Sequence, residues 1–219
     1  MDVGSLLSRC EPFSSLDADM VRAVAETGEL RHLARNVAIF EEGDSADCLY
    51  LVVDGRVAIA NRSTDGRESV VALMEAGDLF GEMSLFDGAG RSAGARAIEA
   101  STVVGIPYAS VRVAIAEQPQ VLWGALSMLA RRLRTTDAAL ADNVFLDVLG
   151  RTAKRLLELA GDADDFALPV TQEELAGIIG ASRERVNKAL ATFVRLGWLH
   201  QTGRRYRILR RDELVLRAR

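Results

Sequence analysis

Histidine, cysteine and proline are scarce in this chain of 219 residues, which contains two histidines, two cysteines and four prolines. Two cysteines form neither a disulfide framework nor the ligand set of an iron–sulfur cluster, so we expect Cys10 and Cys48 to be ordinary core residues. His32 and His200 lie far apart in the sequence, which opposes a metal phosphodiesterase and makes a poor haem site. The composition therefore predicts no metal, and a reducing cytoplasm as the compartment.

Long apolar segments are also absent. No run of roughly 18 consecutive apolar residues occurs, so we expect no membrane span. Met1–Ser5 does not join a basic region to an apolar core, so we expect no secretory signal. An apolar content of 49% is typical of a globular protein, and the length suffices for two domains with a core in each.

The net charge of −4 is unevenly distributed. Residues 1–146 carry 13 basic and 21 acidic side chains, whereas residues 147–219 carry 14 basic and 10 acidic ones. From Phe166 onward the chain has 11 basic and 5 acidic side chains. This asymmetry predicts a basic half that meets a polyanion such as nucleic acid, with a solvated basic face as the alternative.

Residues 30–106 contain short apolar runs separated by glycines, a pattern that predicts a jelly roll or barrel of β-strands. Asp54-Gly55 and Asp65-Gly66 each stand between two such runs. Asp-Gly at that place predicts a hairpin, because both central residues need a positive φ. Further turns are predicted at Glu41–Asp44 and Glu75–Asp78.

Within this region, Phe80–Ala93 places a Gly-Glu pair and an Arg-Ser pair about ten residues apart. The Glu82 carboxylate can accept hydrogen bonds from sugar hydroxyls, and the Arg91 guanidinium can fork onto a phosphate. A short helix opening near Gly81 would direct backbone N–H groups at the same anion. The segment therefore predicts a small pocket for a ribose and a phosphate, as a cyclic nucleotide requires. A surface salt bridge between Glu82 and Arg91 is the alternative.

Two helices are predicted on either side of this region. Asp17–Thr27 indicates a short helix capped by Ser14 or Ser15. A longer helix is expected from Pro119, at its first position, to about Asn143.

The longer helix carries an apolar seam with alternating spacings of four and three. Its members are Leu122, Leu126, Leu129, Leu133, Thr136 and Leu140. The seam is typical of a coiled coil and predicts a two-fold homodimer, with packing on the chain's own barrel as the alternative. Thr136, beside Asp137, either sets the register of this seam or contacts a ligand between barrel and helix.

The last third of the chain predicts a helix-turn-helix. Thr171–Glu174 is a capping box, Gly180 ends the helix that it opens, and Ser182 caps a second helix from Arg183 to about Leu196. The buried faces are assigned to Leu175, Ile178 and Ile179 in the first helix and to Val186, Leu190 and Phe193 in the second.

Polar side chains near the start of the second helix point to base recognition. They are Arg183, Glu184, Asn187 and Lys188. Arginine and lysine can donate to guanine, and glutamate can accept from cytosine, in the major groove. Gln201–Arg205, between two apolar runs, predicts a β-hairpin wing with a basic tip suited to phosphate contacts.

Together these segments resemble the cyclic-AMP receptor protein family of bacterial transcription regulators, within the superfamily that includes the fumarate–nitrate regulators. The resemblance covers essentially the whole chain and is strongest to actinobacterial members, notably at Leu129–Arg134 and Val186–Leu190. It implies an α+β fold with a double-stranded β-helix (jelly roll) cyclic-nucleotide-binding domain over residues 1–117. A dimerisation helix and hinge over residues 118–146 and a winged helix-turn-helix DNA-binding domain over residues 147–219 would follow.

The resemblance also implies site residues. Cyclic nucleotide would be bound by Gly81, Glu82, Met83, Ser84, Arg91, Ser92, Arg132, Thr136 and Asp137. DNA would be contacted by Thr171, Gln172, Ser182, Arg183, Glu184, Asn187, Lys188, Arg204 and Arg205. The implied ligand is cAMP, and the implied partners are a second copy of the chain, RNA polymerase and a palindromic double-stranded operator resembling TGTGA-N6-TCACA. No catalytic residue is implied.

Three residues depart from the family's pattern. Asp137 stands where serine or asparagine is usual, and its carboxylate can accept from an adenine amino group but repels anions. Lys188 replaces an arginine and loses bidentate geometry, and Gln172 replaces an arginine expected near the phosphates. Because of Asp137, sensing of another cyclic nucleotide stays open. DNA binding without a ligand is a further alternative that the sequence leaves open. The shortage of histidine opposes an enzyme acting on cyclic nucleotides, and the basic wing opposes a module that does not bind DNA.

Overall fold

The structure, a computed structural model, describes residues 3–64 and 68–219. The chain divides into two compact units, residues 1–135 and 136–219, and the division falls within helix α5 (Val121–Phe145). The fold is α+β, as predicted. The predicted domain limits at residues 117 and 146 stay predictions. Within the described ranges, no helix is both long and apolar enough to cross a membrane.

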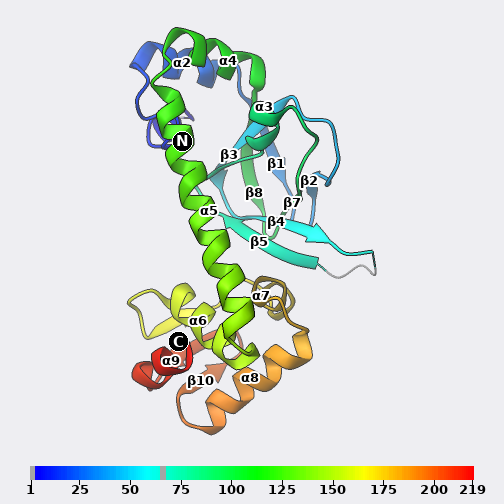
Figure 1. Ribbon diagram of the computed structural model, residues 1–219, viewed down its shortest axis with the longest axis vertical. Helices are drawn as coiled ribbons and strands as arrows, with labels where there is room; N and C mark the ends of the chain where they lie inside the picture. The colour runs from blue at the N-terminus through cyan, green and yellow to red at the C-terminus, as the bar shows by residue number, and fades with distance from the viewer. Residues whose placement is uncertain (1–2, 65–67) are drawn as a thin grey trace. The chain divides into compact units, whose positions relative to one another are not determined.

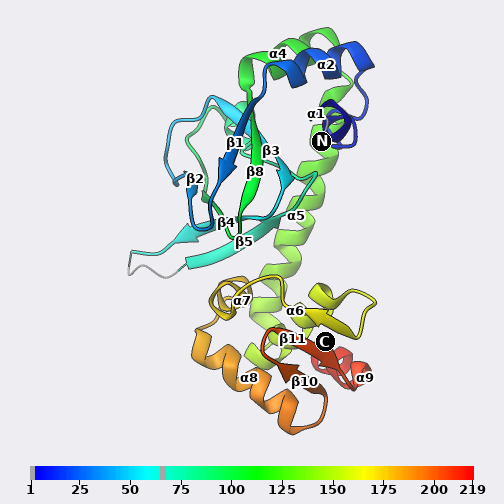
Figure 2. The same ribbon diagram turned by 180° about the vertical axis from the view of Figure 1, so that it is seen from behind.

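The first unit is built on two four-stranded antiparallel sheets, which form the predicted double-stranded β-helix (Figure 1). One sheet has the strand order β1-β8-β3-β6 and the other the order β2-β7-β4-β5. The strands are β1 (Glu29–Leu33), β2 (Ala38–Phe40), β3 (Cys48–Asp54), β4 (Val57–Arg62), β5 (Glu68–Met74), β6 (Leu79–Phe80), β7 (Gly94–Ala97) and β8 (Ser101–Pro107). Figure 2 shows β8 between β1 and β3, which brings distant parts of the chain side by side.

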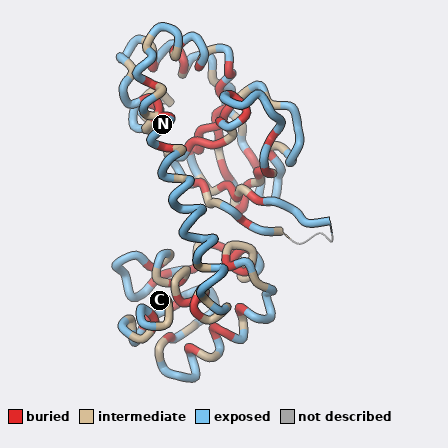
Figure 3. The backbone as a smooth tube through the Cα atoms, in the orientation of Figure 1, coloured by how far each residue is buried: buried red, intermediate tan, exposed pale blue. Residues whose placement is uncertain are grey.

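Strand β3 is buried on both faces. Leu49 and Leu51 pack in one core cluster with the helices of the unit, whereas Tyr50 and Val52 pack in a second cluster inside the roll. Figure 3 shows the resulting concentration of buried residues in the strands of the roll. Apolar side chains on both faces explain why β3 reads as a nearly continuous apolar run rather than as an alternating one.

The predicted hairpin at Asp54-Gly55 is wrong. The strands that this turn joins, β3 and β4, belong to different sheets, so the turn is a corner between the two layers. Gly55 has a φ of 82°, and a Cβ there would lie 2.4 Å from Oγ of Ser101, so the corner needs glycine. Strands β4 and β5 pair as predicted, while Asp65-Gly66 lies outside the described residues.

The two other predicted turns are confirmed. The amide of Asp44 donates to the carbonyl of Glu41 at 3.3 Å, and the amide of Asp78 donates to that of Glu75 at 2.9 Å. Each turn is therefore closed by a hydrogen bond between its first and fourth residues, and the strands on either side of it pair with other strands.

Four short helices belong to the first unit, and each contributes apolar residues to the core cluster that contains Leu49 and Leu51. They are α1 (Val3–Leu7), α2 (Ala18–Glu26), α3 (Met83–Asp87) and α4 (Tyr108–Glu117). The cap of α2 is Asp17, whose carboxylate accepts from the amide of Met20 at 2.8 Å, so the predicted Ser14 or Ser15 cap is wrong. The hydroxyl of Ser14 donates instead to the carbonyl of Glu11, within the preceding turn.

Helix α5 begins later than predicted. Pro119 lies in the turn before it and accepts a hydrogen bond from the amide of Leu122 at 3.1 Å. Its first half buries Val121, Ala125 and Met128 in the first unit. One stripe of α5 therefore packs on the chain's own roll.

The leucine seam of α5 is a different stripe. Leu126 and Leu133 are 55% and 62% exposed, although both are large apolar residues. Leu140 is exposed as well, whereas Leu122 and Leu129 are half-buried and Leu129 packs against the core of the first unit. Packing on the roll thus leaves part of the seam uncovered, and the two interpretations of α5 from the sequence are compatible.

The second unit contains helices α6 (Val148–Ala160), α7 (Gln172–Ile179), α8 (Arg183–Arg195) and α9 (Arg211–Arg217) and strands β9 (Asp165–Ala167), β10 (Leu199–Thr202) and β11 (Arg205–Ile208). The strands form a sheet of order β10-β11-β9. Asp147 caps α6 by accepting from the amide of Gly150 at 2.8 Å, and this hydrogen bond is the main cause of the lowered pKa of Asp147.

The predicted helix-turn-helix is present as α7 and α8 (Figure 1). Thr171 accepts from the amide of Glu174 at 3.2 Å, and the Glu174 carboxylate accepts from the amide of Thr171 at 2.7 Å. Gly180 ends α7 in the left-handed conformation, with a φ of 69°. Ile178 is only half-buried, which corrects its predicted place in the core, and Ala176 is buried instead.

Candidate functional site

Most of the residues predicted to bind nucleotide line one pocket of the first unit. They are Gly81, Glu82, Met83, Ser84, Arg91, Ser92 and Arg132. Strand β6 ends at Phe80 and β7 begins at Gly94, so the segment between them returns from one sheet to the other and brings its two ends together. Apolar side chains of Phe40, Ile59, Met74, Phe80 and Ala93 complete the lining.

Glu82 is only 3% exposed, although it carries a carboxylate. Nη1 of Arg132, from helix α5, lies 2.5 Å from its Oε1, and Nη2 of the same guanidinium donates to the carbonyl of Leu79. A buried carboxylate needs such a cationic partner, because burial removes its hydration. The group expected to meet sugar hydroxyls is therefore tied to the long helix.

Arg91 is also buried, at 5% exposure. Its Nη1 donates to the carbonyl of Gly81 at 2.9 Å and to the hydroxyl of Tyr108 at 3.1 Å, and its Nη2 donates to the carbonyl of Cys48 at 2.7 Å. The guanidinium carbon lies 4.1 Å from the ring centroid of Phe40. Since Glu82 and Arg91 are both buried, the alternative of a surface salt bridge between them is wrong.

These partners of Arg91 are all neutral. In addition, Nε of Arg91 is buried and has no hydrogen-bond partner among the described residues. A buried donor left without a partner costs about 1–3 kcal/mol. An uncompensated buried cation with an open N–H suits a phosphate, and a buried carboxylate beside it suits sugar hydroxyls. The residues present therefore fit a cyclic nucleotide.

Gly81 is required by this arrangement. It has a φ of 76°, and a Cβ at this position would lie 2.6 Å from Nη1 of Arg91. Gly88, which ends α3, also adopts the left-handed conformation, with a φ of 70°. The predicted role of the glycines, a close approach of backbone to the site, is met at Gly81.

The two serines of the segment differ in their hydrogen bonds. Ser84 donates to the carbonyl of Gly90 at 3.2 Å, which fastens α3 to the following loop. Ser92 lies 3.4 Å from the sulfur of Met83, a weak acceptor. The hydroxyl of Ser92 can therefore exchange that contact for a phosphate oxygen at little cost.

Two predicted residues do not line this pocket. Thr136 and Asp137 belong to the second unit, and their contact with nucleotide stays a prediction. The sequence reasoning also missed Phe40, Cys48 and Tyr108, which hold Arg91. Phe40 and Cys48 look like ordinary strand residues in the sequence, and Tyr108 follows β8 with no motif around it.

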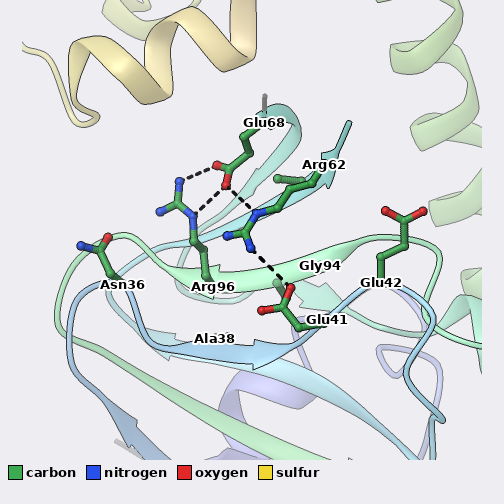
Figure 4. Close-up of a pocket in the computed structure, with 10 residues that line it drawn as sticks. Asn36, Ala38, Glu41, Glu42, Arg62, Glu68, Gly94 and Arg96 are labelled. Carbon is green, nitrogen blue, oxygen red and sulfur yellow. Dashed lines mark hydrogen bonds and ion pairs between the residues drawn. The ribbon is translucent and has the colours of Figure 1, made fainter. Parts of the chain in front are cut away.

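A different pocket lies over the sheet β2-β7-β4-β5 (Figure 4). Its charged side chains pair with one another: Arg96 lies 2.5 Å from Glu68, and Arg62 lies 3.6 Å from Glu68 and 3.9 Å from Glu41. Burial raises the pKa of Glu68, but the hydrogen bonds and positive charges of Arg96 and Arg62 together outweigh that effect and leave the pKa lowered. Since these charges already compensate one another, this pocket is a poorer candidate for an anion than the pocket of Arg91.

The second unit presents the predicted DNA-reading residues on α8. Arg183, Glu184 and Lys188 are exposed, and Asn187 is half-buried. Lys188 lies 2.8 Å from Glu184, and this hydrogen bond lowers the pKa of the Glu184 carboxyl. The pair is exposed and therefore contributes little free energy, so breaking it when Lys188 and Glu184 contact bases costs little. Ser182 caps the helix by accepting from the amide of Arg185.

The wing is a β-hairpin of β10 and β11, as predicted, with Gly203 at its tip. Thr171, Gln172, Arg183 and Arg204 line one pocket between the wing and the helix-turn-helix. Arg204 donates to the carbonyls of Leu168 and Val170 at 3.3 and 3.4 Å. Arg205 lies in β11 and pairs with Asp165 of β9 at 2.8 Å. Part of the wing's positive charge is thus compensated by a strand that the sequence did not predict.

The comparisons with known proteins agree with this division. A model of the cyclic nucleotide-binding domain matches residues 30–118, and a model of the Crp-like helix-turn-helix domain matches residues 150–217. Within the described residues, no group of three or more histidine, cysteine, aspartate or glutamate side chains could hold a metal ion.

Several known regulators are similar along almost their whole length. A CRP-like cAMP-activated global transcriptional regulator of Mycobacterium tuberculosis is 39% identical over 221 residues, which cover 98% of this chain and 99% of that protein. The cAMP-activated global transcriptional regulator Vfr of Pseudomonas aeruginosa is 33% identical over 204 residues, covering 83% and 95%. The structure of the c-di-GMP responsive global regulator CLP of Xanthomonas campestris is 26% identical, covers 88% of this chain and 99% of that one, and has a TM-score of 0.78.

These relatives are transcription regulators and not enzymes, in agreement with the prediction. The buried carboxylate and guanidinium, the helix-turn-helix and the relatives lead to the same conclusion. The chain belongs to the CRP family of transcription regulators, with a cyclic-nucleotide-binding domain followed by a Crp-like helix-turn-helix.

Proposed function

We propose that this protein is a homodimeric transcription regulator that binds cAMP in its β-roll and a palindromic operator through α8. The observation that carries the proposal is the buried Arg91, whose Nε has no partner among the described residues, in the same pocket as the buried Glu82. A carboxylate for ribose hydroxyls and a guanidinium for a phosphate are the two groups that a cyclic nucleotide needs.

Each group has a defined task in this proposal. Glu82 accepts hydrogen bonds from the ribose hydroxyls, and Arg91 donates from Nε to the cyclic phosphate with help from Ser92. Since Glu82 is paired with Arg132, a sugar bound at Glu82 changes the contact between the roll and α5. Thr136 and Asp137, farther along the same helix, are the residues proposed to meet the base.

The response of DNA binding follows from a population shift. Two chains would pair along the seam of α5, whose Leu126 and Leu133 are exposed. The ligand would then favour dimers whose recognition helices stand about 34 Å apart, the distance between successive major grooves. Arg183, Glu184 and Lys188 would read half-sites resembling TGTGA. RNA polymerase as a further partner and the cytoplasm as the location stay predictions.

A second candidate is a regulator of the same fold that senses a different cyclic nucleotide. The relative CLP, whose name describes it as c-di-GMP responsive, supports this alternative. Asp137 supports it as well, because a carboxylate at that position is unusual in the family. Arg91 and Glu82 would bind the phosphate and ribose of either ligand. The contacts made with the base would determine which ligand binds more tightly.

Calorimetric titration of the full-length protein with cAMP, cGMP and c-di-GMP tests the proposal. We expect cAMP to bind at least tenfold more tightly than the other two. Tighter binding of cGMP or c-di-GMP would show that this nucleotide, and not cAMP, is the ligand. Binding of none of the three would contradict a nucleotide-sensing role for the pocket.

A further inference from the structure

Arg91 donates two of its hydrogen bonds from a single nitrogen, and one of the acceptors is a side chain outside the nucleotide-binding segment. Nη1 donates to the carbonyl of Gly81 and to the hydroxyl of Tyr108. Nη2 is fixed on the carbonyl of Cys48, so Nε is the donor without a partner among the described residues. The direction in which Arg91 presents its open N–H thus depends on which acceptors hold Nη1 and Nη2.

Tyr108 is the first residue of α4 and is 5% exposed. Its hydroxyl donates to the carbonyl of Gly81 and accepts from Arg91, so the three groups form a closed triangle. Its backbone amide donates to the carbonyl of Asp47 at 2.7 Å, which fixes the residue beside the strand that carries Cys48. Burial raises the pKa of Tyr108, so the phenol keeps the proton that it donates to Gly81.

We infer that Tyr108 is a positioning residue for nucleotide binding, which acts by holding Nη1 of Arg91 so that Nε is directed at the phosphate. The inference rests on the proposed function of the Arg91 pocket. Without the hydroxyl, Nη1 would keep only one of its two acceptors, in a buried place where water cannot easily replace the other. The guanidinium would then rotate to satisfy its donors, and Nε would lose its direction toward the ligand.

A titration of Tyr108→Phe with cAMP tests the inference, because this change removes only the hydroxyl. We expect an affinity about three- to tenfold weaker than that of the unchanged protein. Tyr50→Phe is the matched control: Tyr50 is similarly buried, and its hydroxyl accepts from Arg31 at 3.3 Å rather than from Arg91. Its ring, 5.6 Å from the Arg91 guanidinium, is retained in the phenylalanine. The control should bind cAMP as the unchanged protein does.

The same substitution in an Arg91→Ala background separates positioning from a general structural effect. If Tyr108 acts through Arg91, removing its hydroxyl should not weaken cAMP binding further in that background. An equal loss in both backgrounds would overturn the inference. Proton exchange at Nε of Arg91, followed by NMR on protein labelled with 15N-arginine, should be faster in Tyr108→Phe, and unchanged exchange would also contradict it.

The proposed function and this inference fail in distinguishable ways. Absence of cAMP binding by the unchanged protein would contradict the proposed function itself. Binding that is weakened by Arg91→Ala but is the same in Tyr108→Phe as in the unchanged protein would leave the function standing and overturn the role of Tyr108.

Discussion

At the scale of single residues, the site depends on how buried charges are compensated. Glu82 has a cationic partner in Arg132, whereas Arg91 is surrounded by carbonyls, a hydroxyl and an aromatic ring. The interior therefore holds a positive charge whose full compensation requires an anion. This difference between two buried charges in one pocket supports a ligand that carries both hydroxyls and a phosphate.

Arg91→Ala should weaken cAMP binding by one to two decades, because it removes a charge-assisted contact worth about 1.5–3 kcal/mol. Calorimetry on the full-length protein measures this change. Arg62→Ala is the control, since Arg62 belongs to the pocket in Figure 4 and its ion pairs are made with Glu41 and Glu68. Equal affinities of the Arg91 variant and the unchanged protein would show that the phosphate is bound elsewhere.

Gly81→Ala should weaken both folding and cAMP binding. A left-handed conformation costs a residue with a Cβ about 1–2 kcal/mol, and this Cβ would also displace Arg91. Gly88→Ala is the matched control, because Gly88 has a similar φ of 70° and a Cβ there would meet nothing within 4 Å. Thermal unfolding should detect a loss in both variants, and cAMP titration a loss only at Gly81. A normal affinity of Gly81→Ala would contradict the fixed position of Arg91.

The sequence predicted Glu82 and Arg91 of this pocket, because a Gly-Glu pair and an Arg-Ser pair stand close together in the chain. It did not predict Tyr108, which lies 17 residues from Arg91 and 27 from Gly81. Tyr108 comes close to Gly81 because the strands that precede them, β8 and β6, both pair with β3. Arg132 was predicted from the resemblance alone. Its ion pair with Glu82 could not be predicted, because it depends on the packing of α5 against the roll.

At the scale of helices and strands, local patterns predicted what depends on local hydrogen bonds. The capping box of α7 and the closed turns of the roll follow from neighbouring residues, and they were predicted correctly. The corner at Asp54-Gly55 was taken for a hairpin because the same dipeptide serves both, and the choice depends on strand partners far away in the chain. Strand β9 has three residues, too few for a recognisable alternation.

Thr171→Ala should destabilise the protein by about 1 kcal/mol, because it removes the acceptor for the amide of Glu174 at the start of α7. Thermal unfolding of the full-length protein measures the loss. Thr171→Ser keeps the hydroxyl and should restore most of the stability. A variant with alanine that unfolds at the same temperature as the unchanged protein would mean that the cap contributes nothing to the helix-turn-helix.

Leu133→Asp should convert a dimer into a monomer, because it places a charge in the middle of the exposed seam of α5. Analytical ultracentrifugation measures the change in mass. Arg134→Asp, one residue farther along the same helix but outside the seam, is the control and should remain dimeric. A monomeric unchanged protein at micromolar concentration would contradict pairing along this seam.

At the scale of the whole molecule, the acidic and basic parts of the chain correspond approximately to its two compact units. The acidic part of the chain holds the pocket of Glu82 and Arg91, and the basic part holds the helix-turn-helix and its wing. Helix α5 is continuous across the division, so a single element carries both Arg132 of the pocket and the residues leading to the DNA-binding part. The central claim is that occupation of the pocket changes the affinity for DNA.

Fluorescence anisotropy of a labelled operator, TGTGA-N6-TCACA, titrated with the protein with and without saturating cAMP, tests that claim most directly. We predict an affinity at least tenfold higher with cAMP, which corresponds to a coupling free energy of about 1.4 kcal/mol. The Arg91→Ala variant, at a cAMP concentration that saturates only the unchanged protein, should show a much smaller difference. Equal affinities of the unchanged protein with and without cAMP would contradict the claim.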